Sequence, residues 1–485
     1  MTGEVEAAMR AHLVRDDGQE DVLIATYVLS TGTERTTALI KSVIYPLEGD
    51  RLVHRNASFT SRYVLRASNE ARTLGHGLVL LHSHPGGRGW QGLSAMDHET
   101  ESEYERVARA ITSKPLLGMT LGVRDTSWSA RFWFERETPI WAESVRSVSS
   151  KLTVTWNDAI RPGPPVTNSQ IRTVSSWGES RQASIARLRV LVVGAGSVGL
   201  DVAQRLAATG LMTVGVMDYD AVESLNLDRM IGATRLDAAL GRSKAGVAAR
   251  LMRSSSTADQ FEVWKHEVSI SDPVGVMAAL DYDVIFSCVD APWPRAVLNA
   301  IAYTDLIPVI DGGIAIDTLP DGRMRNGIWR AHTLAPGRPC MVCLGQLLLG
   351  EVALDKQGLL DDPVYIAAAG RQAPSRQNVA ALSASVSAAL LAQFVSLVAH
   401  PGGRGVSAPL RYVLSTHTLQ HATATSGRFC PYEAATAAGD ERTSIAEHRD
   451  DWRKVVSGRA KMKPPLRLRA IAAAERILLR LISRL

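Results

Sequence analysis

The sequence predicts an α/β protein with two domains, a smaller α/β domain at the N-terminus and a larger one built on a parallel sheet. Three observations predict it. Strand-like runs alternate with one long helical stretch over residues 20–134. A cluster of helix-breaking residues follows at 161–165. Beyond it, an apolar strand leads into a glycine-rich loop and a helix, which is typical of a βαβ unit.

Composition sets the broad class. The chain has 485 residues, 46% hydrophobic and 21% charged, so several buried cores are expected. No signal peptide or run of about 18 apolar residues is evident, and a cytoplasmic protein is expected. The net charge of +5 is concentrated in residues 453–484, where ten Lys and Arg face one acid, so nucleic-acid binding by the body is not expected.

In the N-terminal part, residues 22–29 and 36–45 read as strands and 95–112 as a helix that begins after Ser94. We predict one domain over residues 1–140 and a linker over residues 141–167.

The C-terminal part begins with a strand at 190–193, a helix at 199–209 and a strand at 212–217. Strands at 283–288 and 307–310 follow, and acids stand after the strands, as expected for ligand-binding residues at the carboxyl ends of a parallel sheet. We predict this domain over residues 168–440 and a basic tail with an amphipathic helix over residues 441–485.

A first candidate site lies at the end of an apolar strand, in His82-Ser83-His84-Pro85, with Ser94 and Asp97. Two histidines two residues apart on a strand project to the same side. With Asp97 they offer the three ligands that a catalytic Zn²⁺ takes, which leaves one position open, and Ser94 offers a hydroxyl for a developing oxyanion. The alternative is structural: Ser94 and Asp97 cap a helix, and the histidines are satisfied strand residues.

These motifs resemble the JAB/JAMM (MPN) metalloprotease family over about residues 20–134, although the spacer before Ser94 has nine residues, where the family usually has seven. The resemblance implies a JAB/MPN-type fold, with Glu20 as the base that deprotonates the attacking water and Ser94 supporting the oxyanion. A fold that binds zinc without hydrolysis is an alternative. Weaker matches to the base are Asp21, Glu34 and Glu48.

A second candidate site begins at the glycine loop 194–199 and the acid Asp218, which alone would serve NAD equally well. The segment that follows adds Asn226, Arg229 and Lys244, an amide, a guanidinium and an ammonium suited to a triphosphate. The sequence therefore favours ATP, with an NAD-dependent or inactive domain as the alternative.

This pattern resembles the ThiF/MoeB and ubiquitin-activating enzyme superfamily over about residues 168–400. The resemblance implies a Rossmann-like adenylation domain, in which the C-terminal carboxylate of a ubiquitin-like β-grasp protein attacks the α-phosphate of ATP, and it implies a homodimer. The implied binding residues are the glycines Gly194, Gly196 and Gly199, Asp218 for the ribose, Asn226, Arg229 and Lys244 for phosphates, and Asp290 for Mg²⁺. Other family-like positions are Gln182, Arg295 and Asn299, whereas Ser169 stands where the family has an arginine that Arg172 or Arg181 might replace.

The cysteines suggest a second zinc ion. Cys340-Met-Val-Cys343 resembles half of the structural zinc site of activating domains, and Cys430 stands where a second pair is expected. The fourth ligand would be Glu433, His417 or His421, or the cluster is a degenerate remnant. Whether any cysteine, including Cys288, forms a thioester stays open.

In the tail, an apolar stripe has helical spacing, flanked by arginines. A helix docked on the body, a partner-protein helix and weak attachment to an anionic membrane are the three interpretations. The stripe is Ile471, Ala474, Leu478, Leu481 and Leu485, with Arg469, Arg476, Arg480 and Arg484 around it.

Together, the motifs predict a bifunctional enzyme that adenylates the C-terminus of a ubiquitin-like protein and trims or removes that protein by a zinc-dependent peptidase, working with a ubiquitin-conjugating-like enzyme. Activation and processing of a sulfur carrier protein is the alternative, which a sulfide or rhodanese requirement would favour. A non-catalytic scaffold is a third interpretation, which predicts no ATP turnover.

Overall fold

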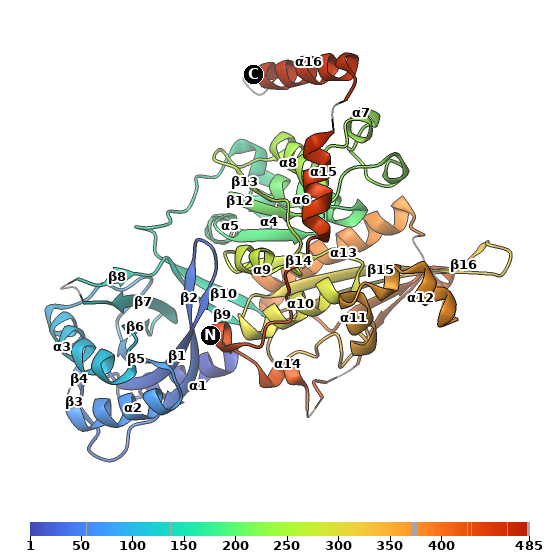
Figure 1. Cartoon of the computed structure of the whole chain (residues 1–485). Coiled ribbons are helices and arrows are strands. Elements are labelled where there is room, and N and C mark those ends of the chain that lie inside the picture. The colour runs from blue at the N-terminus through green and yellow to red at the C-terminus, as the bar shows by residue number, and fades with distance from the viewer. Residues whose placement is uncertain are drawn as a thin grey trace.

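The computed structural model describes residues 1–54, 56–135, 138–370, 377–423, 425–427, 429–462 and 464–482. It contains a six-stranded sheet in the N-terminal part and an eight-stranded sheet in the C-terminal part, each covered by helices (Figure 1). The chain is therefore a mixed α/β protein, as the sequence predicts.

The N-terminal sheet has the order β2-β1-β5-β6-β7-β8. Its strands are β1 (Val22–Thr31), β2 (Thr36–Ile44), β5 (Gly77–His84), β6 (Leu116–Gly122), β7 (Ser127–Trp133) and β8 (Ile140–Trp141). Its helices are α1 (Gly3–Leu13), α2 (Ser61–Thr73) and α3 (Ala95–Thr112), and a small hairpin joins β3 (Arg51–His54) to β4 (Asn56–Phe59).

The alternation of side chains along strand β5 places the first candidate site on one side of the N-terminal sheet. Leu78 and Leu80 pack with residues of α2 and α3, whereas Val79 and Leu81 pack with residues of α1. Because side chains of a strand alternate between faces, the two histidines that end β5 continue the row of Leu78 and Leu80. They therefore point to the side of the sheet where α3 begins.

The segment predicted as a linker, 141–167, contains regular structure. Strands β9 (Ser144–Val148) and β10 (Leu152–Trp156) form an antiparallel pair. Val148, Leu152 and Trp156 are buried in the main core of the C-terminal part. These strands have five residues each and are rich in Ser and Thr. β10 nevertheless alternates apolar and polar residues, a strand pattern that the prediction of a linker overlooked.

The C-terminal sheet has the order β13-β12-β11-β14-β15-β16-β17-β18. The first five strands are parallel and the rest antiparallel, so the prediction of a parallel sheet holds for the half that carries the glycine loop. The strands are β11 (Arg189–Val193), β12 (Thr213–Met217), β13 (Glu262–His266), β14 (Val284–Ser287), β15 (Val309–Thr318), β16 (Met324–Leu334), β17 (Leu410–Val413) and β18 (Thr418–His421).

Helices cover both faces of this sheet. One face packs against α6 (Ser197–Ala208), α8 (Lys244–Ser255) and α13 (Ala380–Ala399), and the other against α9 (Pro273–Ala279) and α10 (Pro292–Thr304). The remaining helices are α4 (Ile171–Trp177), α5 (Glu179–Ala186), α7 (Arg235–Ala239), α11 (Leu349–Lys356), α12 (Pro363–Ala368), α14 (Pro431–Ala434), α15 (Asp451–Lys461) and α16 (Leu466–Ile482). Short 3-10 turns occur at 168–170, 224–226, 359–361, 401–403, 414–416 and 439–441.

Helix α13 is long and apolar enough to span a membrane by length and composition. Half of its apolar window is buried in the protein, and residues such as Val386 and Leu390 belong to the main core. The helix therefore has the features of a core helix, and its serines explain why the sequence did not suggest a span.

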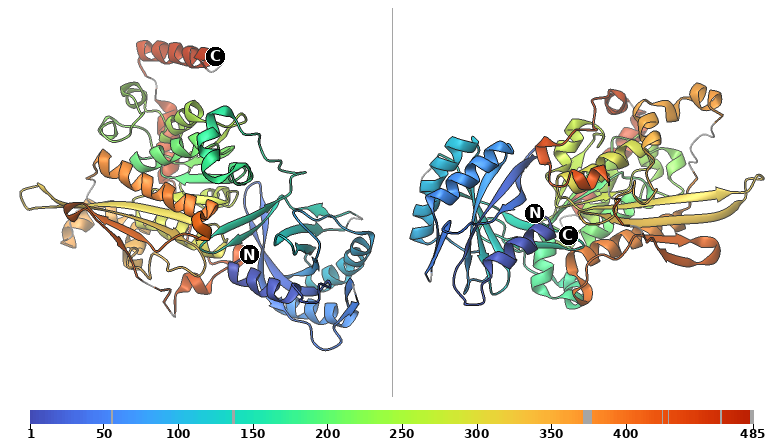
Figure 2. Two further views of the ribbon diagram at one scale, coloured as in Figure 1. Left: turned by 180° about the vertical axis from the view of Figure 1, so that it is seen from behind. Right: turned by 90° about the horizontal axis from the view of Figure 1, so that it is seen from below.

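The two parts of the chain are joined by buried ion pairs. Arg35 near the tip of the β1–β2 hairpin and Arg146 on β9 each place a guanidinium nitrogen 2.7 Å from Asp283. Burial alone would raise the pKa of Asp283, but the two arginines lower it to about 2. Ser30 donates a further hydrogen bond to Asp305, at 2.8 Å. The N-terminal domain is thus fixed against the edge of the larger one (Figure 2).

The tail is held at several points. On α15, Trp452 donates to Asp272 at 3.1 Å, and Arg459 donates to the backbone carbonyl of Tyr219 at 2.9 Å. On α16, Glu475 pairs with Arg242 at 2.5 Å.

The apolar stripe of α16 does not dock on the body. Ile471 and Leu478 are 52% and 58% exposed, whereas Ala472, on another side of the helix, is buried. The interpretation of a docked stripe is therefore wrong, because the helix contacts the body through Ala472 and Glu475. The predicted residues Arg484 and Leu485, and the side chains of Arg480 and Leu481, lie outside the described residues.

Candidate functional site

Strand β5 and helix α3 bring the predicted metal ligands together. The Nε2 atoms of His82 and His84 lie 3.2 Å apart, and the carboxylate of Asp97 lies 3.6 Å from the first and 3.8 Å from the second. Two atoms bound to one tetrahedral zinc ion at about 2.05 Å each lie about 3.3 Å apart. The three side chains therefore fit a single zinc ion with little rearrangement.

The protonation states of the histidines suit metal binding. Burial, with the charge of Arg131 as a second cause, lowers the pKa of His82 to about 3, so its ring is neutral at pH 7. The Nδ1 of His84 lies 3.3 Å from the Oε1 of Gln91, a contact that leaves Nε2 free to bind a metal when Nδ1 carries the proton. Gln91 is a supporting residue inside the nine-residue spacer that the motif did not reveal.

Glu20, the predicted base, stands just before β1. Burial raises the pKa of its carboxyl, the charge of His84 opposes that shift, and Asp97 adds to it. Glu20 is thus within electrostatic range of the triad. Of the alternative acids, Asp21 pairs with Arg15 and Arg51. The backbone N–H of Glu34 donates to Asp281, which places Glu34 at the contact with the larger domain.

Ser94 is both a helix cap and a neighbour of the metal ligands. Its hydroxyl accepts a hydrogen bond from the backbone N–H of Asp97 at 3.1 Å, and the Asp97 carboxylate accepts from the Ser94 N–H at 3.0 Å. This capping box fixes Asp97 at the helix N-terminus. The hydroxyl only accepts in this pair, so its own proton remains available to an oxyanion.

A buried ion pair that the sequence did not reveal contacts the candidate metal ligands through a neighbouring side chain. Arg131 on β7 is fully buried and pairs with Glu101, one turn beyond Asp97 on α3. Arg131 also donates to Thr120 at 2.8 Å, and the Thr120 hydroxyl lies 3.3 Å from Nε2 of His82. The only sequence signal was the four-residue spacing of Asp97 and Glu101, which places both on one face of α3.

In the second site, the glycines have distinct geometric roles. Gly194 has a φ of +91°, and a Cβ there would lie 2.6 Å from the carbonyl oxygen of Cys288. A Cβ on Gly199 would lie 1.8 Å from the oxygen of Gly194, so α6 can approach the loop only with glycine there. A Cβ on Gly196 would meet nothing within 4 Å. The loop thus leaves the N-terminus of α6 open, as dinucleotide and nucleotide loops do.

Acidic groups and one lysine gather beside this loop. Asp218 accepts backbone hydrogen bonds from Ala195 at 2.7 Å and Asp220 at 2.8 Å. Burial raises the pKa of Asp218 to about 6, although Lys244 opposes the shift. Lys244 opens α8 and places its ammonium 2.7 Å from Asp220. Burial alone would lower the pKa of Lys244, but Asp218, Asp220 and more weakly Asp290 raise it.

Asn226 and Arg229 make local contacts. The Asn226 side chain accepts from the backbone N–H of Glu223 at 2.9 Å. Arg229 donates to the carbonyl of Leu225 at 2.7 Å and pairs with Asp228 at 2.8 Å. Within the described part of the chain, the guanidinium of Arg229 makes no ion pair with the acids around Lys244. Their predicted binding of phosphates would require these two side chains to exchange partners.

The other family-like positions have structural partners. Arg295 lies 3.5 Å from Asp311, and Asn299 accepts from the backbone of Met341 at 3.1 Å. Gln182 donates to the carbonyl of Thr209 at 3.0 Å and so supports the end of α6. Arg172 and Arg181 are both exposed, and Arg172 lines a cavity of about 340 Å³ at the C-terminal half of α6, away from the glycine loop.

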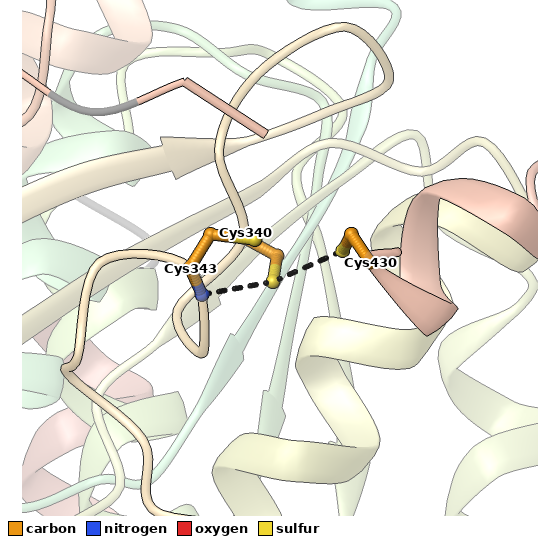
Figure 3. Close-up of side chains that lie close together, drawn as sticks. All are labelled: Cys340, Cys343 and Cys430. Atoms are coloured by element: carbon orange, nitrogen blue, oxygen red, sulfur yellow. Dashed lines mark hydrogen bonds between the residues drawn. The ribbon is translucent and has the colours of Figure 1, made fainter. Parts of the chain in front are cut away.

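Three cysteines of the larger domain lie close together (Figure 3), two of them buried and Cys343 partly exposed. The sulfurs of Cys340 and Cys430 lie 3.5 Å apart, and Cys343 completes a group whose ligand atoms all lie within 4.8 Å of one another. Burial raises the pKa of the Cys340 thiol to about 12. Glu433, one predicted fourth ligand, instead accepts from the backbone of Gly337 at 2.9 Å. The donor set fits three bonds of a zinc ion, and the described residues bring no fourth His, Cys or acid into the group.

The histidines predicted as alternatives lie elsewhere. His417 contacts the hydroxyl of Tyr412 at 2.6 Å, and His421 is exposed at the end of β18. Cys288 follows β14, and burial raises the pKa of its thiol well above the ordinary value. A group held protonated in this way is a poor nucleophile, so Cys288 is unsuited to thioester formation.

The fold and the glycine loop define a Rossmann-like domain. Residues 167–400, slightly less than half of the chain, match the model of the ThiF family, so the chain is similar to that family over this segment. The adenylyltransferase and sulfurtransferase MOCS3 of Caenorhabditis briggsae is 29% identical over 171 residues, 35% of this chain and 40% of that protein. MOCS3 of Xenopus laevis is 33% identical over 124 residues, 25% of this chain and 26% of that protein. The chain therefore spans less than half the length of these curated relatives.

Among solved structures, Escherichia coli MccB with ATP superposes with a TM-score of 0.43 and 18% identity, covering 56% of this chain and 76% of that one. E. coli tRNA N6-threonylcarbamoyladenosine dehydratase, TcdA, with ATP gives a TM-score of 0.29 and 26% identity, covering 36% of this chain and 66% of that one.

Proposed function

We propose that the larger domain adenylates the C-terminal carboxylate of a ubiquitin-like β-grasp protein. The observation that carries this proposal is the glycine loop against the N-terminus of α6, with Asp218 and Lys244 at its side, in a segment that matches the ThiF family. An open helix N-terminus and an ammonium favour phosphate groups. The curated relatives are named adenylyltransferases, which agrees with this chemistry.

In this reaction the substrate carboxylate attacks the α-phosphate of ATP, an acyl adenylate forms and pyrophosphate leaves. The chain's own residues need only bind, orient and neutralise charge, because the nucleophile is already ionised. Asp218 would accept from the ribose, since each of its oxygens keeps a lone pair beyond its backbone contact. Lys244, Asn226 and Arg229 would bind phosphates, and Asp290 would hold Mg²⁺.

Pyrophosphate exchange tests this proposal. The purified chain is incubated with ATP, labelled pyrophosphate and each small β-grasp protein that ends in glycine and is encoded near it. Exchange that depends on one such protein and is lost on Lys244→Ala supports the proposal. Exchange with free amino acids alone, or bound NAD in place of ATP, would contradict it.

We further propose that the N-terminal domain is a zinc peptidase of the JAB/JAMM type that trims or removes the same protein. The distances among His82, His84 and Asp97, close to those of tetrahedral zinc ligands, carry this second proposal. Zinc bound there would supply a Lewis acid that polarises the scissile carbonyl and acidifies water. Glu20 would accept the proton of the attacking water and pass it to the leaving amine, and Ser94 would donate to the oxyanion.

Cleavage of a β-grasp fusion tests the peptidase. The β-grasp protein that passes the exchange test is extended by a short peptide beyond its terminal glycine, and the product is measured by mass. Cleavage that needs zinc and is lost on His82→Ala supports the proposal. Tight zinc binding with no cleavage of any such fusion would favour a metal-binding fold without hydrolysis.

One alternative substrate class shares every residue discussed above. The relatives are named sulfurtransferases as well as adenylyltransferases, so a sulfur carrier protein could be the adenylated partner. A thiocarboxylate product in the presence of sulfide would identify that class. Transfer of the acyl group to a ubiquitin-conjugating-like enzyme would identify a conjugation system instead.

A further inference from the structure

Helix α16 presents an apolar face that no other described part of the chain covers. Leu466, Ile471, Ile477 and Leu478 are 79%, 52%, 62% and 58% exposed. At 100° per residue these four side chains fall within one 140° sector of the helix, together with the exposed Ala470 and Ala474. The exposed Arg467, in the first turn, is the one charged residue in this sector among the described residues of the helix. Large apolar side chains rarely gather on one exposed face without a partner.

The direction of this face is fixed by the contacts on the other side of the helix. Glu475 pairs with Arg242 at 2.5 Å and lies 3.9 Å from Arg250, and Ala472 is buried. These residues hold α16 at the periphery of the larger domain (Figure 1). Because the contacts lie on the other side of the helix, the apolar face is turned away from the domain.

The charge beside this face is strongly positive. Arg467, Arg469 and Arg476 are exposed on α16, and the exposed Arg453 and Lys461 precede them on α15. Residues 453–484 contain ten Lys and Arg and a single acid, Glu475, which is already paired with the body. Arg469 and Arg476 lie on one flank of the apolar face, and Arg467 lies within its first turn. An apolar face with arginines on its flank and at its start matches the interface of an anionic lipid surface, which takes the apolar side chains while its headgroups neutralise the cations.

We propose that α16 attaches the protein peripherally to membranes that contain anionic lipid, by inserting the face formed by Leu466, Ile471, Ile477 and Leu478. A second copy of the chain fits less well, because pairing two such faces by symmetry brings their arginine rows together.

Vesicle flotation with the full chain tests this proposal. Vesicles of phosphatidylcholine alone are compared with vesicles that contain about one-third phosphatidylglycerol. Three exposed arginines on α16 predict more than about tenfold stronger binding to the anionic vesicles at low salt, and weaker binding at high salt. Equal binding to both vesicles, or none to either, would overturn the proposal.

Matched variants distinguish binding through the apolar face of α16 from non-specific adsorption to lipid. The double variant Ile477→Asp and Leu478→Asp should lose vesicle binding, and R469E with R476E should lose the preference for anionic lipid. Val364→Asp, which changes a 77% exposed side chain on α12, should bind as the unaltered protein does. Since all these side chains are exposed, thermal unfolding should be unchanged.

Sedimentation velocity without vesicles completes the test. A dimer of the unaltered protein that Ile477→Asp and Leu478→Asp dissociates would overturn the proposal, because the face would then bind a second copy. An oligomeric state that is the same in both proteins, combined with lost flotation, supports attachment to lipid.

Discussion

The two candidate sites differ in how far they are organised before any ligand binds. In the N-terminal site, the two histidine Nε2 atoms already stand 3.2 Å apart, and one oxygen of the Asp97 carboxylate lies 3.6 Å from His82 and the other 3.8 Å from His84. A strand end and a helix cap hold these groups in place. In the nucleotide site, the cations are engaged by nearby protein groups: Lys244 with Asp220, and Arg229 with Asp228.

The difference follows from the elements that carry the residues. Strand β5 and the first turn of α3 have defined side-chain directions, so a short motif fixes where the three candidate ligands lie. Asn226 lies in a 3-10 turn and Arg229 follows it in a loop. In such segments neighbouring backbone and side-chain groups are as accessible to these side chains as a bound phosphate would be. We therefore expect activity at the first site to be lost when one of the three ligands is removed. At the second site, we expect ATP binding to require that Lys244 and Arg229 leave their present partners.

The largest expected effect is on cleavage. Glu20→Gln should lower the rate of β-grasp fusion cleavage about 10²- to 10⁴-fold, because it removes the base and leaves the ligands. The zinc content, measured by atomic emission, should not change. His82→Ala should lose both cleavage and this zinc ion, while pyrophosphate exchange persists in both variants. Unchanged cleavage in Glu20→Gln would exclude Glu20 as the base.

The buried contact that joins the two domains is the next to test. Asp283→Ala leaves Arg35 and Arg146 buried without their partner and should cost about 3–5 kcal/mol in unfolding free energy. Urea denaturation measures this. The control is Asp317→Ala, which breaks a fully exposed pair with Arg325 and should change nothing measurable. Equal effects of the two changes would show that the domains are not held by Asp283.

Adenylation should depend on the lysine of α8. Lys244→Ala should lower pyrophosphate exchange about 10²- to 10³-fold, the loss expected for one group that stabilises transition-state charge. Arg229→Ala tests whether this site exchanges side-chain partners when ATP binds. A loss of similar size means that Arg229 leaves Asp228 when ATP binds, whereas a loss below threefold means that it keeps its local partners.

The ion pair below the metal site should have a smaller effect. Glu101→Gln weakens the support that Arg131 gives to Thr120 and His82, so zinc affinity should fall about 10- to 100-fold in competition with a chelator. Glu105→Gln is the matched control, since Glu105 lies one turn further along α3 and pairs with Arg109. If both changes weaken zinc equally, the effect comes from the stability of α3.

The smallest expected effect is on the pH dependence of nucleotide binding. The pKa of Asp218 is raised to about 6, so its carboxylate forms as pH rises through 6. ATP affinity should therefore be about tenfold weaker at pH 5 than at pH 7, one unit below and one above this pKa. Asp218→Asn should bind ATP weakly at both pH values, in a calorimetric titration that also corrects for protonation of ATP. A full pH dependence in Asp218→Asn would assign the titration to another group.

The raised pKa of Asp218 also has a consequence for stability. The folded pKa of Asp218 lies above its unfolded value of 3.8, so the folded state binds the proton more tightly. This contribution stabilises the fold below pH 3.8 and is lost as pH rises through 6. In the protein without ATP, ionisation of the buried Asp218 carboxylate near pH 7 thus lowers the stability of the fold, as is common for residues at ligand sites.

Much of both sites could be predicted from short-range sequence patterns. The helix 95–112 has the bounds predicted, because Ser94 and Asp97 are a local capping signal. The glycine loop and the strand before it follow from the same kind of signal. The contacts of Arg131 with Glu101 and Thr120 could not be predicted, since they join residues from three different elements.

The orientation of the tail also escaped sequence analysis. A helical stripe identifies an apolar face but not what it contacts, and only the Glu475–Arg242 pair shows that the stripe of α16 is turned outward. The strands β9 and β10 were missed because they are short and precede a Pro- and Gly-rich segment, although β10 alternates apolar and polar residues.

Pyrophosphate exchange is the measurement that tests the central claim most directly. The account predicts exchange that requires ATP, Mg²⁺ and one β-grasp protein with a free C-terminal glycine, and that disappears when this glycine is amidated. Exchange that persists after amidation, or its absence with every β-grasp candidate while ATP remains bound, would contradict the claim that this chain activates a β-grasp C-terminus.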